Sequence, residues 1–185
     1  MTIARRAFLR TGGSALLATI GGITPSFASI MAATTGARIL SLSNLHTGEK
    51  VKLDYWIEGR YEPAALAEAN RVLRDYRTGE VHPIEPRLFD LLHALQQNLE
   101  SNTAYEVISG YRSPQTNAAL HERSSGVASN SLHMQGMAMD VRLPGRALAK
   151  LHDAAMALGQ GGVGFYPASD FVHVDVGRVR RWNGV

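Results

Sequence analysis

Apolar and polar residues alternate near the start of the folded part of the chain. Between residues 38 and 45 apolar side chains alternate with serines, and the alternation resumes at residues 51–57 after a polar turn at residues 46–49. A period of two places successive side chains on opposite faces of a strand. This stretch therefore predicts a β-hairpin.

The pattern then changes to the spacing of amphipathic helices. Residues 63–77 and 86–99 carry apolar side chains three and four positions apart, and each segment has a proline where its first turn would lie. Proline is favoured at the first helical position because its missing N–H has no helical partner there. The same criteria predict helices at residues 114–123 and 146–158.

Further strands are predicted at residues 105–109, after Gly136, at the glycine-rich residues 161–167, and at residues 171–176. Strands and helices do not alternate as βαβ units, which argues against a parallel sheet. We expect an α+β fold, with an antiparallel sheet, helices on one face and a cleft on the other. Glycine within a strand indicates close approach of another group, so an extended peptide could lie along residues 161–167.

The first 28 residues have the composition of an export signal. Arg5 and Arg6 precede an apolar, glycine-containing run, and a small-residue site ends at Ala28. This matches a twin-arginine signal, and we expect cleavage after Ala28. The apolar run is shorter than the roughly 20 residues that span a bilayer, so no stable membrane insertion is expected afterwards. Residues 29–185 would then form one domain.

Removing this segment changes the charge of the protein. The chain has 19 basic and 16 acidic residues, but residues 1–28 hold three of the arginines and no acid, so the remainder is balanced at 16 of each. No basic stripe with interleaved aromatic residues is present, which excludes nucleic acid as an expected partner. The chain has no cysteine. Any metal site must therefore use histidine and carboxylate ligands.

Two short segments carry the candidate chemistry. His133 and Asp140 flank Gly136 within the sequence SLHMQGMAMD, and His173 and Asp175 share one face of an apolar strand. A single histidine is more often a hydrogen-bonded core or surface residue than a metal ligand. Two imidazoles and a carboxylate on rigid elements are nevertheless what a catalytic zinc site needs, with the fourth position left for water.

The order of the motifs resembles a known family. Residues 109–112 read SGYR, residues 131–140 follow the pattern S-x-H-x-x-G-x-A-x-D, and GGVGFYP at residues 161–167 leads into FVHVD at residues 171–175. Together they resemble the D-alanyl-D-alanine zinc peptidases, which share a fold with the hedgehog signalling domain. Within that group the chain is most similar to the YcbK-like (MepK-type) periplasmic murein endopeptidases.

The resemblance implies a zinc metallopeptidase that hydrolyses the stem-peptide crosslinks of peptidoglycan. It implies one zinc ion per chain, held by His133, Asp140 and His173. Arg112 would stabilise an oxyanion or bind a substrate carboxylate, since a planar guanidinium suits either task. A monomer in the periplasm is expected.

The general base is left open between two aspartates. Related peptidases carry Glu-x-x-His, and Asp170 occupies the position of that glutamate. Asp175 shares the face of His173 and either acts as the base or orients the histidine.

Two alternative functions also stay open. One is a D,D- or L,D-carboxypeptidase acting on the same substrate. The other is a non-catalytic zinc-containing module that binds the cell wall.

Overall fold

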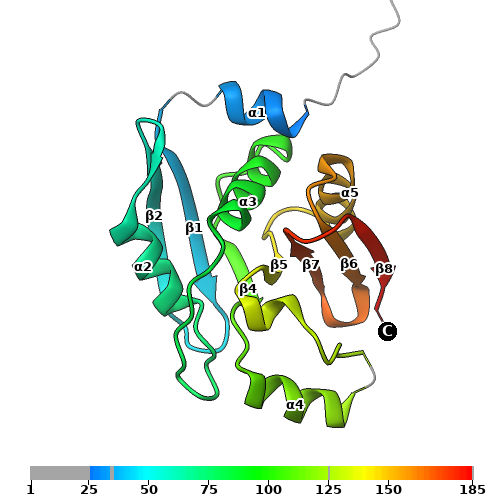
Figure 1. The fold of residues 1–185 in the computed structure, drawn as a ribbon. Coiled ribbons are helices and arrows are strands. Elements are labelled where there is room, and N and C mark those ends of the chain that lie inside the picture. The colour runs from blue at the N-terminus through cyan, green and yellow to red at the C-terminus, as the bar shows by residue number, and fades with distance from the viewer. Residues whose placement is uncertain (1–25, 34–35, 125, 185) are drawn as a thin grey trace, which may run out of the picture.

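A computed structural model describes residues 26–33, 36–124 and 126–184 of the chain. Its strands form one sheet in the order β3-β2-β1-β4-β5-β7-β6-β8 (Figure 1). The α-helices are α1 (Phe27–Ala33), α2 (Pro63–Val72), α3 (Pro86–Asn98), α4 (Pro114–Arg123) and α5 (Leu148–Leu158), and the 3-10 helices are η1 (Leu132–Gln135) and η2 (Pro167–Ser169). The strands are β1 (Arg38–Asn44), β2 (Lys50–Ile57), β3 (Arg60–Tyr61), β4 (Tyr105–Ser109), β5 (Ala138–Arg142), β6 (Gly162–Tyr166), β7 (Phe171–Asp175) and β8 (Arg180–Asn183).

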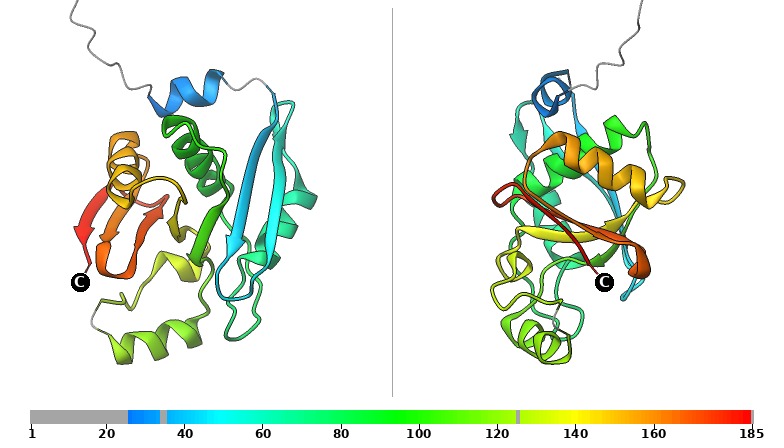
Figure 2. Two further views of the ribbon diagram at one scale, coloured as in Figure 1. Left: turned by 180° about the vertical axis from the view of Figure 1, so that it is seen from behind. Right: turned by 90° about the vertical axis from the view of Figure 1, so that its right-hand side faces the viewer.

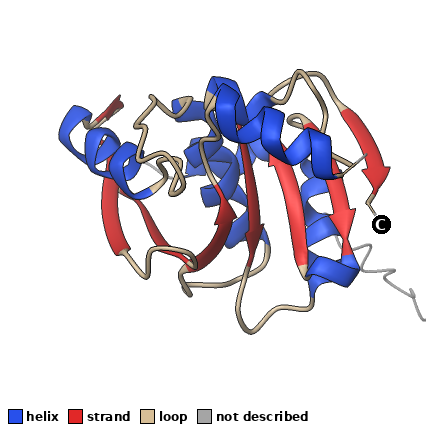
Figure 3. Ribbon diagram, turned by 90° about the horizontal axis from the view of Figure 1, so that it is seen from below, coloured by secondary structure: helices blue, strands red, loops and turns tan. Residues whose placement is uncertain are grey.

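The sheet is mostly antiparallel, so the prediction of an antiparallel sheet is confirmed only in part. β1 pairs with β4 and β6 pairs with β8 in parallel. β7 has β5 along one edge and β6 along the other. The strand that follows it in the chain, β8, therefore pairs with the free edge of β6 and runs parallel to it. Figure 3 shows the strands following one another across the sheet to β8, next to the C-terminus.

The two faces of the sheet have different characters at β5 and β7. Met139 and Val141 on β5 belong to the buried hydrophobic core, as do Val172 and Val174 on β7, and α3 and α5 contribute the facing side chains. Because side chains alternate along a strand, the residues between them point to the opposite face. On that side of the sheet lie α4 and the segment around η1 (right-hand view of Figure 2). The predicted helical layer is therefore made by α3 and α5, while α4 lies across the sheet from it.

Most predicted elements are present, with altered ends. The helix expected over residues 63–77 ends at Val72. It stops because Asp75 leaves the helical path and its carboxylate accepts hydrogen bonds from the backbone N–H groups of Arg77 and Ser113, each at 2.9 Å. Ser113 caps α4 as expected, with its Oγ accepting from Thr116 N at 3.2 Å. The strands β3 and β8 and the helix α1 had not been predicted.

The predicted export signal falls largely outside the described residues. Its end, at residues 26–28, coincides with the start of α1. This helix packs against α3, and its Ile30 is buried in the core. Within the described part of the chain, no helix has both the length and the apolarity needed to cross a membrane.

Candidate metal centre and its pocket

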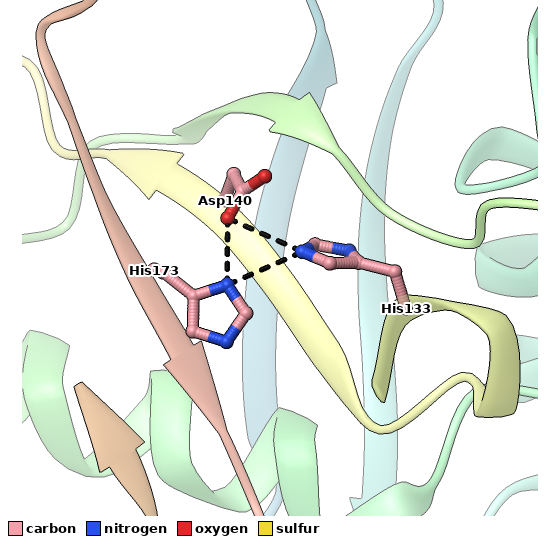
Figure 4. A group of neighbouring side chains, drawn as sticks. All are labelled: His133, Asp140 and His173. Atoms are coloured by element: carbon pink, nitrogen blue, oxygen red, sulfur yellow. Dashed lines mark hydrogen bonds and ion pairs between the residues drawn. The ribbon is translucent and has the colours of Figure 1, made fainter. Parts of the chain in front are cut away.

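Three predicted ligands meet on the face of the sheet opposite α5. Asp140 on β5 is paired directly with His173 on β7, and η1 carries His133 to the same point. Asp140 Oδ1 lies 2.9 Å from His173 Nδ1 and 3.3 Å from His133 Nε2, and the two imidazole nitrogens are 3.2 Å apart (Figure 4). All three residues are buried. The structure thus brings together residues that are 40 positions apart in the chain.

A backbone carbonyl fixes the orientation of the His133 ring. His133 Nδ1 lies 2.8 Å from the carbonyl oxygen of Gly110, so Nδ1 donates its hydrogen there. In a neutral imidazole the other nitrogen then carries the lone pair. His133 Nε2 is therefore available to a cation at the point where the three side chains meet. Burial lowers the pKa of His133, which favours this neutral form.

The segment that carries His133 depends on a glycine. Gly136 ends η1 in the left-handed conformation, with φ of 65°, and its carbonyl accepts a hydrogen bond from Glu85 N at 2.9 Å. A side chain at this position would overlap the carbonyl oxygen of Pro83. Gly136 is therefore required both by its dihedral angle and by the close approach of the loop before α3.

A carboxylate orients the second histidine from behind. Asp175 Oδ2 accepts a hydrogen bond from His173 Nε2 at 3.1 Å, which leaves Nδ1 facing the centre. Asp175 is fully buried, and its Oδ1 accepts from the backbone N–H groups of Gly162 and Gly177, both at 2.9 Å. Arg180 completes the shell, with Nη2 lying 2.7 Å from Oδ2. Burial opposes ionisation, but the His173 and Arg180 contacts hold the pKa of Asp175 well below its usual range.

The centre has a strong affinity for positive charge. Burial alone would raise the pKa of Asp140, but the two neighbouring histidines hold that pKa far below its usual range. Burial likewise would lower the pKa of His173, yet Asp140 and Asp175 together raise it to about 9. A proton is thus held tightly between two carboxylates, at the position where a metal ion would replace it.

The geometry and the ligand types fit a zinc ion. Zinc binds imidazole nitrogen and carboxylate oxygen at about 2.0–2.1 Å, which places two ligands of a tetrahedral ion about 3.3 Å apart. The three distances between the ligand atoms are 2.9, 3.2 and 3.3 Å. The His133, Asp140 and His173 side chains therefore match three corners of a tetrahedral site, and the carboxylate that orients His173 is a common feature of such sites.

Arg112 lies beside the centre with unused hydrogen-bonding capacity. Its Nη2 is 3.6 Å from Asp140 Oδ2 and 3.3 Å from Ser109 Oγ, and its backbone N donates to His133 O at 3.2 Å. Its buried Nε has no hydrogen-bond partner among the described residues, and burial lowers its pKa. Because that Nε is enclosed, it is not the atom that a ligand in the pocket would contact.

Neither candidate base presents an oxygen to the centre. Asp170 lies in a left-handed turn after η2, its side chain is 62% exposed, and its Oδ2 is 2.8 Å from Arg142 Nη1. Asp175 is enclosed behind His173. Among the described residues that line the pocket at the centre, Asp140 supplies the only carboxylate.

The pocket has a volume of about 340 Å³ and opens over the three ligands. Gly126 to Ala128, residues 130–132 and Arg112 contribute to its lining. The lining also includes side chains to which the sequence had assigned no role; they are Tyr166, Phe171, Arg180 and Trp182.

The glycines of β6 make room for two of these lining side chains, Arg180 and Trp182. A side chain at Gly162 would overlap the Arg180 guanidinium, and one at Gly164 would lie 2.6 Å from the Trp182 indole. The expectation that a peptide lies along β6 was therefore wrong, because β8 occupies that edge. The sequence did contain a signal for the pairing of β6 with β8. Gly162 and Gly164 are two residues apart, as are Arg180 and Trp182, and paired strands place such residues opposite each other.

Comparisons with known proteins identify close relatives. A family model described as peptidoglycan L,D-endopeptidase MepK matches residues 32–182. The chain is 46% identical to the peptidoglycan L,D-endopeptidase MepK of Escherichia coli (strain K12) over 178 residues, covering 96% of each chain. It is 42% identical to the probable peptidoglycan L,D-endopeptidase MepK of Haemophilus influenzae over 182 residues, covering 98% of this chain and 96% of the relative.

Proposed function

The chain belongs to the peptidoglycan L,D-endopeptidase MepK family, and from this premise we propose that it is a zinc-dependent endopeptidase that hydrolyses stem-peptide crosslinks of peptidoglycan. The observation that carries the zinc assignment is the triangle formed by His133 Nε2, Asp140 Oδ1 and His173 Nδ1. One zinc ion per chain would be held by these three atoms. When bound, zinc polarises a carbonyl group and lowers the pKa of water.

Arg112 and Asp140 have separate roles in the proposed reaction. Arg112 lines the pocket and lies next to Asp140, so it stabilises the negative charge that develops on the scissile carbonyl oxygen. The two neighbouring histidines hold the pKa of Asp140 far below its usual range, so Asp140 stays ionised throughout the physiological range.

We assign Asp175 the task of orienting His173, and not that of the base. Both of its oxygens are occupied and it has no exposed surface. Replacing Asp175 with asparagine should weaken zinc binding by about 10- to 100-fold. Cleavage should recover when zinc is supplied in excess. The measurement is zinc affinity by competition with a chelator, alongside cleavage rates at saturating zinc. Full zinc occupancy with cleavage still lost would make Asp175 the base.

The products of cleavage test the proposed function. Purified sacculi incubated with the protein, followed by separation of soluble muropeptides by chromatography and mass, should show loss of crosslinked dimers joined through an L-to-D peptide bond. Shortened stem peptides with intact crosslinks would instead establish a carboxypeptidase. Bound zinc without any cleavage would establish a non-catalytic module that binds the cell wall.

Location and assembly follow from the substrate. Peptidoglycan lies outside the cytoplasmic membrane, and Arg5 and Arg6 introduce a segment with the composition of a twin-arginine signal. We therefore place the mature enzyme in the periplasm, with peptidoglycan stem peptides as its partner and a single chain as the working unit.

A further inference from the structure

We propose that Tyr166 is a further catalytic residue, whose hydroxyl donates a hydrogen bond to the scissile carbonyl oxygen in addition to Arg112. Tyr166 lines the same pocket as the three residues of the metal centre. The inference rests on the proposed endopeptidase function and adds a second donor to it. It is carried by the position of the ring, by the hydrogen bond that the hydroxyl accepts from Trp182, and by the packing of Trp182 on His173.

The ring of Tyr166 is held by two neighbours. It stacks on Phe171 with centroids 4.5 Å apart and an interplanar angle of 17°. The backbone of Gly184 lies so close to the ring that any side chain there would overlap it. Gly184 is held in turn by a hydrogen bond from its N–H to Phe165 O at 2.8 Å. A ring held by two neighbours directs its hydroxyl with little freedom, as a preorganised donor requires.

The hydroxyl of Tyr166 already accepts a hydrogen bond. Trp182 Nε1 lies 2.8 Å from Tyr166 Oη, and an indole nitrogen can only donate. The phenol oxygen is therefore the acceptor in this pair, and its own hydrogen must be donated to something else. Because the residue lines the pocket, that hydrogen is available to a bound substrate. An accepted hydrogen bond also polarises the hydroxyl and strengthens it as a donor.

The tryptophan connects this hydroxyl to a residue of the metal centre. The Trp182 ring centroid is 5.1 Å from that of His173. The same indole, including Nε1, covers Gly164, which is paired with His173 across β6 and β7. Tyr166 Oη is thus hydrogen-bonded to the Trp182 ring, and that ring packs on the proposed ligand His173. Arg112 approaches the centre from the side of Asp140.

These positions define a role in the transition state. Hydrolysis of an amide places negative charge on the carbonyl oxygen, and donors aimed at that charge are stronger in the transition state than with substrate. Arg112 would supply a charged donor and Tyr166 a neutral one, both from the lining of the same pocket. No proton leaves Tyr166 in this scheme.

Replacing Tyr166 with phenylalanine removes only the hydroxyl and tests the role. With purified crosslinked muropeptide dimers as substrate, kcat should fall about 100-fold while KM changes less than about threefold. Zinc content and melting temperature should stay at the wild-type values. A phosphinate analogue of the scissile bond, which mimics the tetrahedral state, should lose affinity by the same factor as kcat/KM, while the product peptide binds unchanged.

The matched control is Tyr76→Phe. Tyr76 stacks on His46 beside the β1–β2 turn and is absent from the pocket lining. Wild-type kcat in Tyr166→Phe would overturn the proposal, as would a loss of activity that follows a loss of zinc. If the wild-type protein cleaves no dimer while retaining zinc, the proposed function itself fails. Those results are distinguishable, because only the last concerns the unmodified protein.

Discussion

Replacing His133 with alanine should reduce crosslink cleavage by roughly 10³-fold or more, because the remaining two ligands cannot hold zinc in a catalytic geometry. His133 Nε2 forms one corner of the ligand triangle, and Gly110 O holds the ring in the ligating tautomer. The measurement is zinc content by elemental analysis together with the rate of dimer cleavage. Both should fall together.

His46→Ala is the matched control for this variant. His46 is an exposed histidine after β1 that stacks on Tyr76. Its replacement should leave zinc content and rate unchanged. Retention of one zinc per chain and normal cleavage in His133→Ala would remove His133 from the site. Circular dichroism must show that the variant is folded, because a buried side chain is being truncated.

Replacing Arg112 with alanine should lower kcat by about 10²- to 10³-fold with little change in zinc content. The guanidinium lines the pocket, with Nη2 3.6 Å from Asp140 Oδ2. Arg112→Lys should restore little of the rate, because an ammonium group cannot present the planar donor geometry. Steady-state kinetics on crosslinked dimers measures the effect.

The split between kcat and KM decides what Arg112 recognises. A fall in kcat at constant KM means that the donor acts on the transition state. A rise in KM with kcat preserved would contradict that role and assign Arg112 to a substrate carboxylate. The Tyr166→Phe, Arg112→Ala double variant should lose more than either single variant, because the two donors would share one oxygen.

The metal ligands could be predicted from the sequence because each lies on a regular element. The period of two at β7 placed His173 and Asp175 on one face, and Gly136 marked the turn that returns the chain to β5. Pairing of Asp140 with His173 then follows from the register of two adjacent strands. Local pattern and tertiary structure agree at these positions, which is why the three side chains that the sequence singled out lie close together in the structure.

Other features depended on contacts that no local pattern records. The end of α2 is set by Asp75, whose carboxylate binds Ser113, 38 residues further along the chain. β8 is short and contains adjacent arginines, so its periodicity is weak, and its place beside β6 follows from the occupied edges of β7. The role of Asp175 was open in the sequence because its enclosure by Gly162, Gly177 and Arg180 is a tertiary property.

The central claim is that one zinc ion bound by His133, Asp140 and His173 is required for cleavage of peptidoglycan crosslinks. The most direct measurement strips the purified mature protein with a chelator and titrates zinc back while following the release of monomeric muropeptides from crosslinked dimers. The account predicts no cleavage without metal and a rate that rises linearly to a plateau at one zinc per chain. Undiminished cleavage by the metal-free protein, or a plateau well away from one equivalent, would contradict it.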